Sequence, residues 1–204
     1  MYDTFNNNPN EVAYLFGLIL GDGHLKKIPS CRTTTRVSIA FDKKYQPLIN
    51  TFESVGNTLK IHYFVEPKIH DNCQMIGFSM PDDILKKYNM LWNGAKYNSQ
   101  PHPSTKIVRN INFASGLINS DGHIRKKYKN NKSIHFYNTV KTIVSAYTEC
   151  LDKNNIYYTI NKRKGKIDKR NGNQWKDGWL VNILRKEDVK NICLSSNFIL
   201  KGLE

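Results

Sequence analysis

Two aspartates stand at equivalent positions in two copies of one short sequence pattern. Asp22 ends the apolar run of EVAYLFGLILGDGHLKK, residues 11–27, and Asp121 ends the apolar run of FASGLINSDGHIRKK, residues 113–127. The two aspartates are 99 residues apart, and the aligned copies also share a glycine, a Leu-Ile pair and a Gly-His pair. The chain therefore repeats one pattern with a carboxylate at its end.

A carboxylate at the end of a helix is locally unfavourable. Its charge meets the negative end of the helix dipole, which costs roughly 0.3–1 kcal/mol. Gly17 and Gly21, four residues apart, form a flat helix face that lets another backbone approach closely. If the two helices pack side by side, Asp22 and Asp121 meet at the same end and repel each other unless a cation lies between them. A hard divalent cation, Mg²⁺ or Mn²⁺, would satisfy both carboxylates.

A single Asp-Gly pair at a helix end is an ordinary turn signal. Two copies at one offset, each with small residues on the same helix face, are poorly explained by turn chemistry alone. The repetition therefore favours a metal site over a pair of unrelated turns.

The elements that position the first aspartate follow a clear order. Residues 36–41 alternate in polarity with period two, as expected of a half-buried strand, and residues 45–59 have the apolar spacing of an amphipathic helix. The first repeat is predicted as a helix to Asp22, a hairpin over 24–41, a helix over 45–59, a hairpin over 61–80 and a helix over 81–91.

The second half of the chain repeats this order after a stretch rich in Asn, Pro and Ser, residues 92–110, which we interpret as a linker. The sequence predicts an α+β fold of two αββαββα repeats, residues 1–91 and 111–204, with mixed or antiparallel sheets and pseudo-twofold symmetry. Its elements are helices over 112–121 and 138–154, a hairpin ending at 137, strands near 156–164 and 178–185, and a helix from 186.

The charge of the protein points to an anionic partner. Lys and Arg number 31 against 17 Asp and Glu, a net charge of +14. Residues 1–100 contribute +2 and residues 101–204 contribute +12, so the second half dominates long-range attraction. No apolar run approaches the roughly 20 residues of a membrane span, which argues against a membrane partner. The four cysteines have neither zinc-ligand nor disulfide-framework spacing.

The two patterns carry a resemblance to a known family. LFGLILGDG, residues 15–23, and ASGLINSDG, residues 114–122, resemble the two motifs of the LAGLIDADG homing endonucleases in their single-chain form. The resemblance covers nearly the whole chain, since the elements fall in the family's order. The second motif departs from the commonest letters at Ala114, Ser115, Asn119 and Ser120. The resemblance implies two repeats whose sheets form a DNA-binding saddle.

The resemblance also implies the chemistry. Asp22 and Asp121 would bind the catalytic Mg²⁺ or Mn²⁺ ions, with the backbone carbonyls of Gly21 and Ser120 as further ligands. The implied reaction is hydrolysis of one phosphodiester in each strand of double-stranded DNA, leaving 3′ overhangs. The implied protein is a monomer, and its DNA site is long and either pseudo-palindromic or asymmetric.

The family tends to place a lysine after the last helix of each repeat, near the scissile phosphates. Lys96 and Lys201 match those places here, 74 residues after Asp22 and 80 after Asp121. They would orient water and offset phosphate charge. The alternative is that both are ordinary exposed lysines.

Sequence-specific binding is expected from the hairpins, because a two-stranded ribbon fits the major groove. Many of the side chains would contact only phosphates, which position the protein without reading sequence. For the basic stretch 162–170, the alternative to contact with phosphates is a solvated loop that does not bind DNA. The candidate DNA-binding residues are Lys26, Arg32, Arg36, Ser38, Arg125, Lys127, His135, Lys162 and Lys164.

Several functions remain open from the sequence. A site-specific homing endonuclease that cuts both DNA strands is favoured over a protein that only binds RNA, because RNA binding does not require paired carboxylates at helix ends. An intron RNA-binding maturase is the main alternative, and a DNA-binding regulator without activity is a third. A domain inside an intein is disfavoured by the terminal residues, Met1 and Glu204. The protein is expected inside a cell, with mitochondrion, plastid and phage or bacterial cytoplasm not distinguished.

Overall fold

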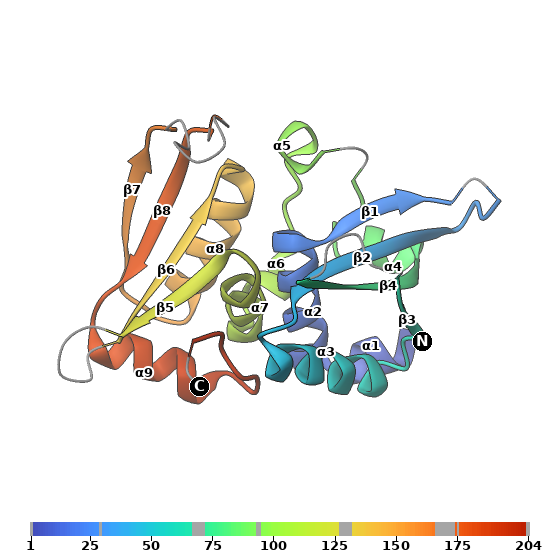
Figure 1. The fold of residues 1–204 in the computed structure, drawn as a ribbon, viewed down its shortest axis with the longest axis horizontal. Helices are drawn as coiled ribbons and strands as arrows, with labels where there is room; N and C mark the ends of the chain where they lie inside the picture. Colours follow the sequence, from blue (N-terminus) through green and yellow to red (C-terminus); the bar gives the residue numbers. More distant parts are fainter. Residues whose placement is uncertain are drawn as a thin grey trace.

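The computed structural model shows two four-stranded antiparallel sheets on either side of two central helices, α2 (Pro9–Asp22) and α7 (Ile111–Asp121) (Figure 1). This arrangement confirms the predicted α+β fold of two repeated units. The structure describes residues 2–28, 30–66, 72–92, 95–126, 132–165, 174 and 176–202.

The first unit contains one sheet and the helices that pack on it. Its strands lie in the order β1-β2-β4-β3. After the short helix α1 (Tyr2–Asn7) and α2, the elements are β1 (His24–Lys27), β2 (Thr34–Asp42), α3 (Gln46–Thr58), β3 (Tyr63–Val65), β4 (Cys73–Pro81) and α4 (Asp82–Lys87).

The second unit repeats this topology. Its strands lie in the order β5-β6-β8-β7, which is the order of the first sheet with every strand replaced by its counterpart. After α7 the elements are β5 (Gly122–Lys126), β6 (Lys132–Asn138), α8 (Lys141–Lys153), β7 (Thr159–Arg163), β8 (Gly178–Ile183) and α9 (Lys186–Ser195).

The stretch between the units is more ordered than the linker that we expected over 92–110. It contains two short helices, α5 (Lys96–Ser99) and α6 (Thr105–Val108). Ile107 and Val108 are buried, and α6 contacts α2, α7 and α8. Part of this stretch therefore belongs to the core, where its apolar residues cover the central helices.

The central helices cross through their glycines. A Cβ atom on Gly116 would lie 2.9 Å from Gly17 Cα and would strike the Tyr14 carbonyl oxygen, so the two backbones are in direct contact. One turn further on, Gly21 faces Ser120, whose hydroxyl donates to Leu117 O (2.9 Å) within its own helix. The serine that departs from the family pattern is thus accommodated opposite a glycine. This close crossing brings the carboxyl ends of the two helices together.

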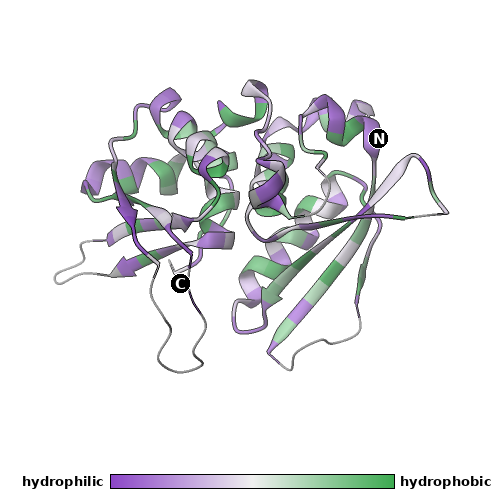
Figure 2. Ribbon diagram, turned by 90° about the horizontal axis from the view of Figure 1, so that it is seen from above, coloured by the Kyte–Doolittle hydropathy of each residue, from purple (hydrophilic) through white to green (hydrophobic). Residues whose placement is uncertain are grey.

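Each sheet has one apolar face and one polar face. On β2, Val37, Ile39 and Phe41 are buried, and the Phe41 ring packs against Phe52 of α3 (centroids 5.5 Å apart). Arg36 and Ser38 alternate with them and point to the opposite side, which we call the open face. Figure 2 shows the alternation of hydrophilic and hydrophobic residues along the strands. None of the described helices is long and apolar enough to span a bilayer.

Candidate active site between the motif helices

Asp22 and Asp121 are the last residues of their helices, and the helix crossing brings them to one place. The glycine that follows each aspartate is extended, and its N–H bonds back to the carbonyl of the residue four positions earlier. The chain therefore leaves the helix at once and enters β1 or β5. A Cβ atom on Gly21 would lie 3.3 Å from Asp121 Oδ2, which places the carboxylate of one repeat against the motif backbone of the other.

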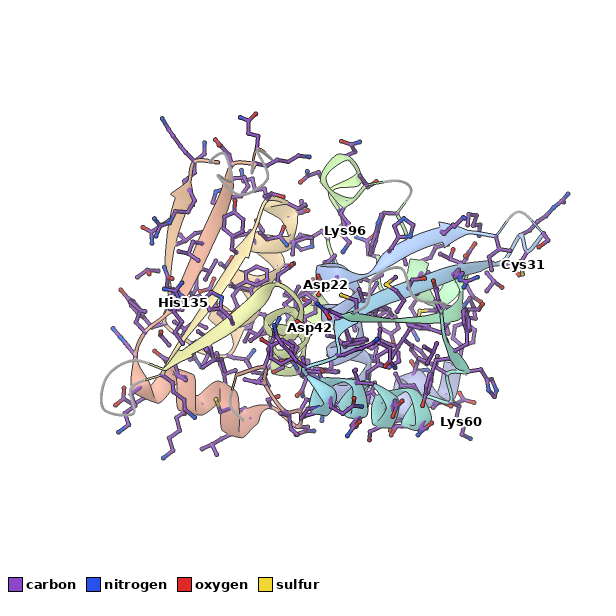
Figure 3. All side chains as sticks on the ribbon, in the orientation of Figure 1. Asp22, Cys31, Asp42, Lys60, Lys96 and His135 are labelled. Carbon is purple, nitrogen blue, oxygen red and sulfur yellow. The ribbon has the colours of Figure 1, made fainter. Side chains whose placement is uncertain are left out.

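Lys96 reaches this place from α5. Its ammonium donates to Leu20 O (3.0 Å) and to Gly21 O, the two carbonyls that precede Asp22. Burial lowers the pKa of Lys96 to about 8, against the opposing effect of the charges on Asp121 and Asp22. Figure 3 shows Lys96 beside Asp22, where the two repeats meet. The structure thus places a cation among the oxygens that were predicted to bind metal.

The two carboxylates are not in equivalent surroundings. Burial raises the pKa of Asp121 to about 6, and the neighbouring charge of Asp22 adds to this shift. Asn138 of β6 opposes it by donating to Asp121 Oδ2 (2.7 Å). Burial also raises the pKa of Asp22, against the charges of Lys96 and Lys201. The charges of the two lysines thus favour the ionised form of both carboxylates.

A buried asparagine holds the segment that carries Lys201. Asn119 Oδ1 accepts from the backbone N–H of Lys201 (2.8 Å), and its Nδ2 donates to Ile199 O (2.8 Å) and to Tyr14 Oη (2.9 Å). The Tyr14 ring in turn stacks on Phe198, with centroids 4.1 Å apart. Asn119 was noted in the sequence only as a departure from the motif. In the structure it ties the segment after α9 to the helix crossing.

The Asp22 side of the site opens into a cavity of about 290 Å³. Its polar lining includes Asp22, Asp42, Lys201 and Tyr45. The Lys201 ammonium lies 4.9 Å from the centre of the Tyr45 ring, and its charge acts on both motif aspartates. Asp42, at the end of β2, was not a sequence candidate. Figure 3 shows it close to Asp22.

The donor set fits a hard divalent cation. It consists of two carboxylates and backbone carbonyls, all of which are oxygen ligands, and Mg²⁺ is commonly held by one or two carboxylates with water and substrate phosphate completing its shell. Among the described residues, no group of three or more His, Cys, Asp or Glu side chains comes together. The Lys96 ammonium shows that these oxygens favour a positive charge. Because the ammonium and a metal cation at Gly21 O would repel each other, we expect Lys96 to move when this carbonyl binds metal.

Replacing Lys96 with methionine should make the protein more dependent on divalent metal for stability. The variant lacks the cation that offsets Asp22 and Asp121, and it has no ammonium to displace from Gly21 O. The rise in melting temperature on adding Mg²⁺ should therefore be larger in Lys96→Met than in the unmodified protein. Differential scanning calorimetry with and without Mg²⁺ measures this, with Lys153→Met on α8 as the control. An equal rise in both variants would contradict the assignment.

Metal binding should strengthen as the pH rises through about 6. Asp121 must lose its proton to bind a cation, and its pKa is raised from 3.8 to about 6. Without metal, the folded state holds this proton more tightly than the unfolded state does. Protonation of Asp121 therefore stabilises the folded protein below about pH 4, and this contribution to stability is lost as the pH rises through about 6. The melting-temperature gain from Mg²⁺ should be larger at about pH 7.5 than at about pH 5. Equal gains at the two pH values would refute this.

The structure places the first-repeat DNA candidates on or next to the first hairpin. Lys26 on β1 and Arg32 in the turn are exposed. Arg36 and Ser38 lie on the open face of β2, where both bind Glu66, at 3.1 and 2.6 Å. Ser38 is buried and holds Glu66, so any contact of its side chain with DNA stays a prediction.

The second-repeat candidates form a more connected group. Arg125 is exposed and its Nε donates to His123 Nε2 (3.0 Å), while the His123 ring stacks on His135 with centroids 5.2 Å apart. His135 is half-buried and is hydrogen-bonded to Asn182 (2.7 Å) and Ser133 (2.9 Å). His135 is labelled on the second sheet in Figure 3. Lys162 and Lys164 are exposed at the end of β7 and just beyond it, whereas Lys127 lies outside the described residues.

Comparison with known proteins agrees with this geometry. Residues 110–194 match the family model of a LAGLIDADG-like domain. A relative, the ATP-dependent DNA helicase Hel308 of Methanocaldococcus jannaschii, is 28% identical over 170 residues, which are 82% of this chain. The match covers only 14% of that helicase.

Solved structures share the fold over nearly the whole chain. The homing endonuclease I-DmoI in complex with DNA and calcium is 19% identical, with a TM-score of 0.57 over 97% of this chain and 95% of its own. The LAGLIDADG meganuclease I-AabMI bound to uncleaved DNA is 12% identical, with a TM-score of 0.52 over 96% and 85%. The resemblance that the two motifs predicted is confirmed. The second repeat thus resembles a LAGLIDADG-like domain, and the whole chain shares the fold of these two-repeat endonucleases.

Proposed function

We propose that the protein is a site-specific endonuclease that cuts both strands of double-stranded DNA with Mg²⁺ or Mn²⁺. The observation that carries the proposal is the meeting of Asp22 and Asp121, one from each repeat, around a bound ammonium group. Structures of I-DmoI with DNA and calcium or manganese support it, since the fold is shared. Because one chain supplies both carboxylates, it acts as a monomer.

The residues of the site have different roles in the proposed hydrolysis. A bound divalent ion supplies the activation of water and the stabilisation of the leaving 3′ oxygen. Asp22 and Asp121 hold the cation, and Asn138 fixes the orientation of the Asp121 carboxylate. Lys96 and Lys201 bring positive charge to the scissile phosphates and help to orient water.

The distribution of charge suits a long duplex. Of the net charge of +14, residues 101–204 supply +12. Both hairpins also carry exposed basic side chains that can contact DNA phosphates. Binding should therefore release counterions and weaken steeply as salt rises. The same basic surface also suits intron RNA, so a maturase role is the second candidate.

Cleavage of a randomised duplex library tests the proposal. With Mg²⁺, the protein should release ends that share one long sequence and carry 3′ overhangs, and EDTA should prevent release. Library DNA that stays intact with Mg²⁺ and with Mn²⁺, together with tight binding of intron RNA, would favour the maturase. Ends that share no sequence would contradict site specificity.

A further inference from the structure

An acidic side chain lies in the middle of the basic open face of the first sheet. Glu66 follows β3, and its Oε1 accepts from Arg36 Nη2 (3.1 Å) and from Ser38 Oγ (2.6 Å). The Glu66 side chain is 16% exposed, whereas that of Arg36 is 40% exposed. The carboxylate is thus largely covered, and the guanidinium that it holds remains accessible.

Two further residues fix the geometry of this pair. The Arg36 guanidinium carbon lies 4.5 Å from the centre of the Phe64 ring, a cation–π contact that sets the plane of the guanidinium. Gly77 of β4 lies beneath them. A Cβ atom there would come within 2.5 Å of Glu66 Oε1 and 2.7 Å of the Phe64 ring. The glycine therefore gives both side chains room to reach across the strand to Arg36.

The second sheet has different chemistry at the equivalent place. Ser38, Gly77 and Phe64 are paired across the first sheet, and His135, Asn182 and Thr159 are paired in the same way across the second. The imidazole of His135 is bound there by a neutral amide. By the same register the counterpart of Glu66 is Asn161, an amide, so the carboxylate at this place belongs to the first repeat as far as the described residues show. Beside DNA it repels phosphate, so an ordinary phosphate-binding arginine would be weakened by it.

A held arginine is well suited to read a base. A guanidinium has five N–H donors in a planar fork, so the bond from Nη2 to Glu66 leaves capacity for the two bonds that guanine accepts at O6 and N7. Holding the fork in place before binding lowers the entropy lost when those bonds form. A phosphate contact needs no such restraint.

We propose that Arg36 reads a guanine in the half-site bound by the first repeat and that Glu66 is the residue that positions it. The inference rests on the proposed function, because it requires the open face to meet the major groove. Ser38 and Phe64 complete the restraint, and Gly77 makes room for it.

Selection of bound duplexes from a randomised library, with Ca²⁺ in place of Mg²⁺, tests the inference without depending on cleavage. The unmodified protein should enrich guanine at one position of one half-site. Glu66→Ala and Arg36→Lys should each reduce that preference by about tenfold or more at the same position. The double variant should lose little more than either single variant, since both changes remove one interaction. Glu66→Gln, which keeps an acceptor oxygen, should retain part of the preference.

Glu53→Ala on α3 is the matched control, because it removes the same charge from the opposite side of the sheet. It should leave the selected sequence unchanged. Enrichment of guanine that persists in Glu66→Ala would overturn the inference, and so would a base preference that depends on Glu66 but survives in Arg36→Lys. If Glu66→Ala does not fold, the comparison is made with Glu66→Gln and Arg36→Lys. Failure of the unmodified protein to enrich any sequence would instead contradict the proposed function.

Discussion

Asp22→Asn and Asp121→Asn are each expected to reduce double-strand cleavage by at least about 100-fold, since even residues that only support metal ligands cost 10–100-fold when changed. Asparagine keeps the shape of the side chain and removes the charge that, on the proposed function, would hold the cation. DNA binding should persist or strengthen, because a negative charge next to phosphates has been lost. Cleavage of a selected site under single-turnover conditions, with binding measured in Ca²⁺, separates these two effects.

Asp152→Asn is the matched control for these variants. Asp152 is an exposed residue of α8, and its carboxylate accepts a hydrogen bond from Tyr158 (3.3 Å). The same change of charge there should leave cleavage unaltered. Full activity in either motif variant would show that hydrolysis does not depend on the pair of carboxylates.

Gly116→Ala is expected to lower the free energy of unfolding by about 1–3 kcal/mol or more, the usual cost of overpacking a well-packed core. The added methyl group would strike the Tyr14 carbonyl oxygen and lie 2.8 Å from Leu18 N, and backbone atoms cannot turn aside as a side chain can. The helices must then separate, which also moves Asp22 away from Asp121. Urea denaturation followed by circular dichroism measures the loss.

Gly56→Ala in α3 provides the comparison. Among the described residues, a Cβ atom there meets only the ring of Tyr63, at 3.3 and 3.4 Å. Alanine is favoured over glycine within a helix by roughly 0.5–1 kcal/mol, so this variant should be about as stable as the unmodified protein. Equal stability of Gly116→Ala and Gly56→Ala would mean that the helix crossing does not require glycine.

The sequence predicts the architecture well because the signals are repeated and local. Period-two alternation marks β2, and the apolar spacing of residues 45–59 marks α3, which spans Gln46–Thr58. The offset between the motifs predicts the repeat, and the glycines predict the crossing of α2 and α7. Each of these predictions rests on residues that are close together in the sequence or that lie on the same face of one helix.

The short helices were not predicted. α1, α5 and α6 have too few residues for a periodic pattern, and α5 and α6 lie in a stretch whose Asn, Pro and Ser content suggested a linker. Packing against the central helices stabilises α6, and that contact is set by the tertiary fold. Composition alone therefore describes this stretch incompletely.

Partners of the site residues were missed for a related reason. Asn138 reaches Asp121 because of where β6 ends, and Glu66 reaches Arg36 because Gly77 leaves room between them. Neither residue has a distinctive neighbourhood in the sequence. Lys96 was expected near the phosphates, but its bond to the Gly21 carbonyl depends on the path of the chain into α5. Such contacts follow from strand register and loop path, which the sequence pattern does not specify.

Locating the divalent ion is the most direct test of the account. Crystals of the protein with its selected DNA site and Mn²⁺ should show anomalous scattering next to the carboxylates of both Asp22 and Asp121, with Lys96 displaced from Gly21 O. Anomalous scattering at neither carboxylate, with Lys96 still bound to that carbonyl and the DNA seated on the protein, would contradict the central claim.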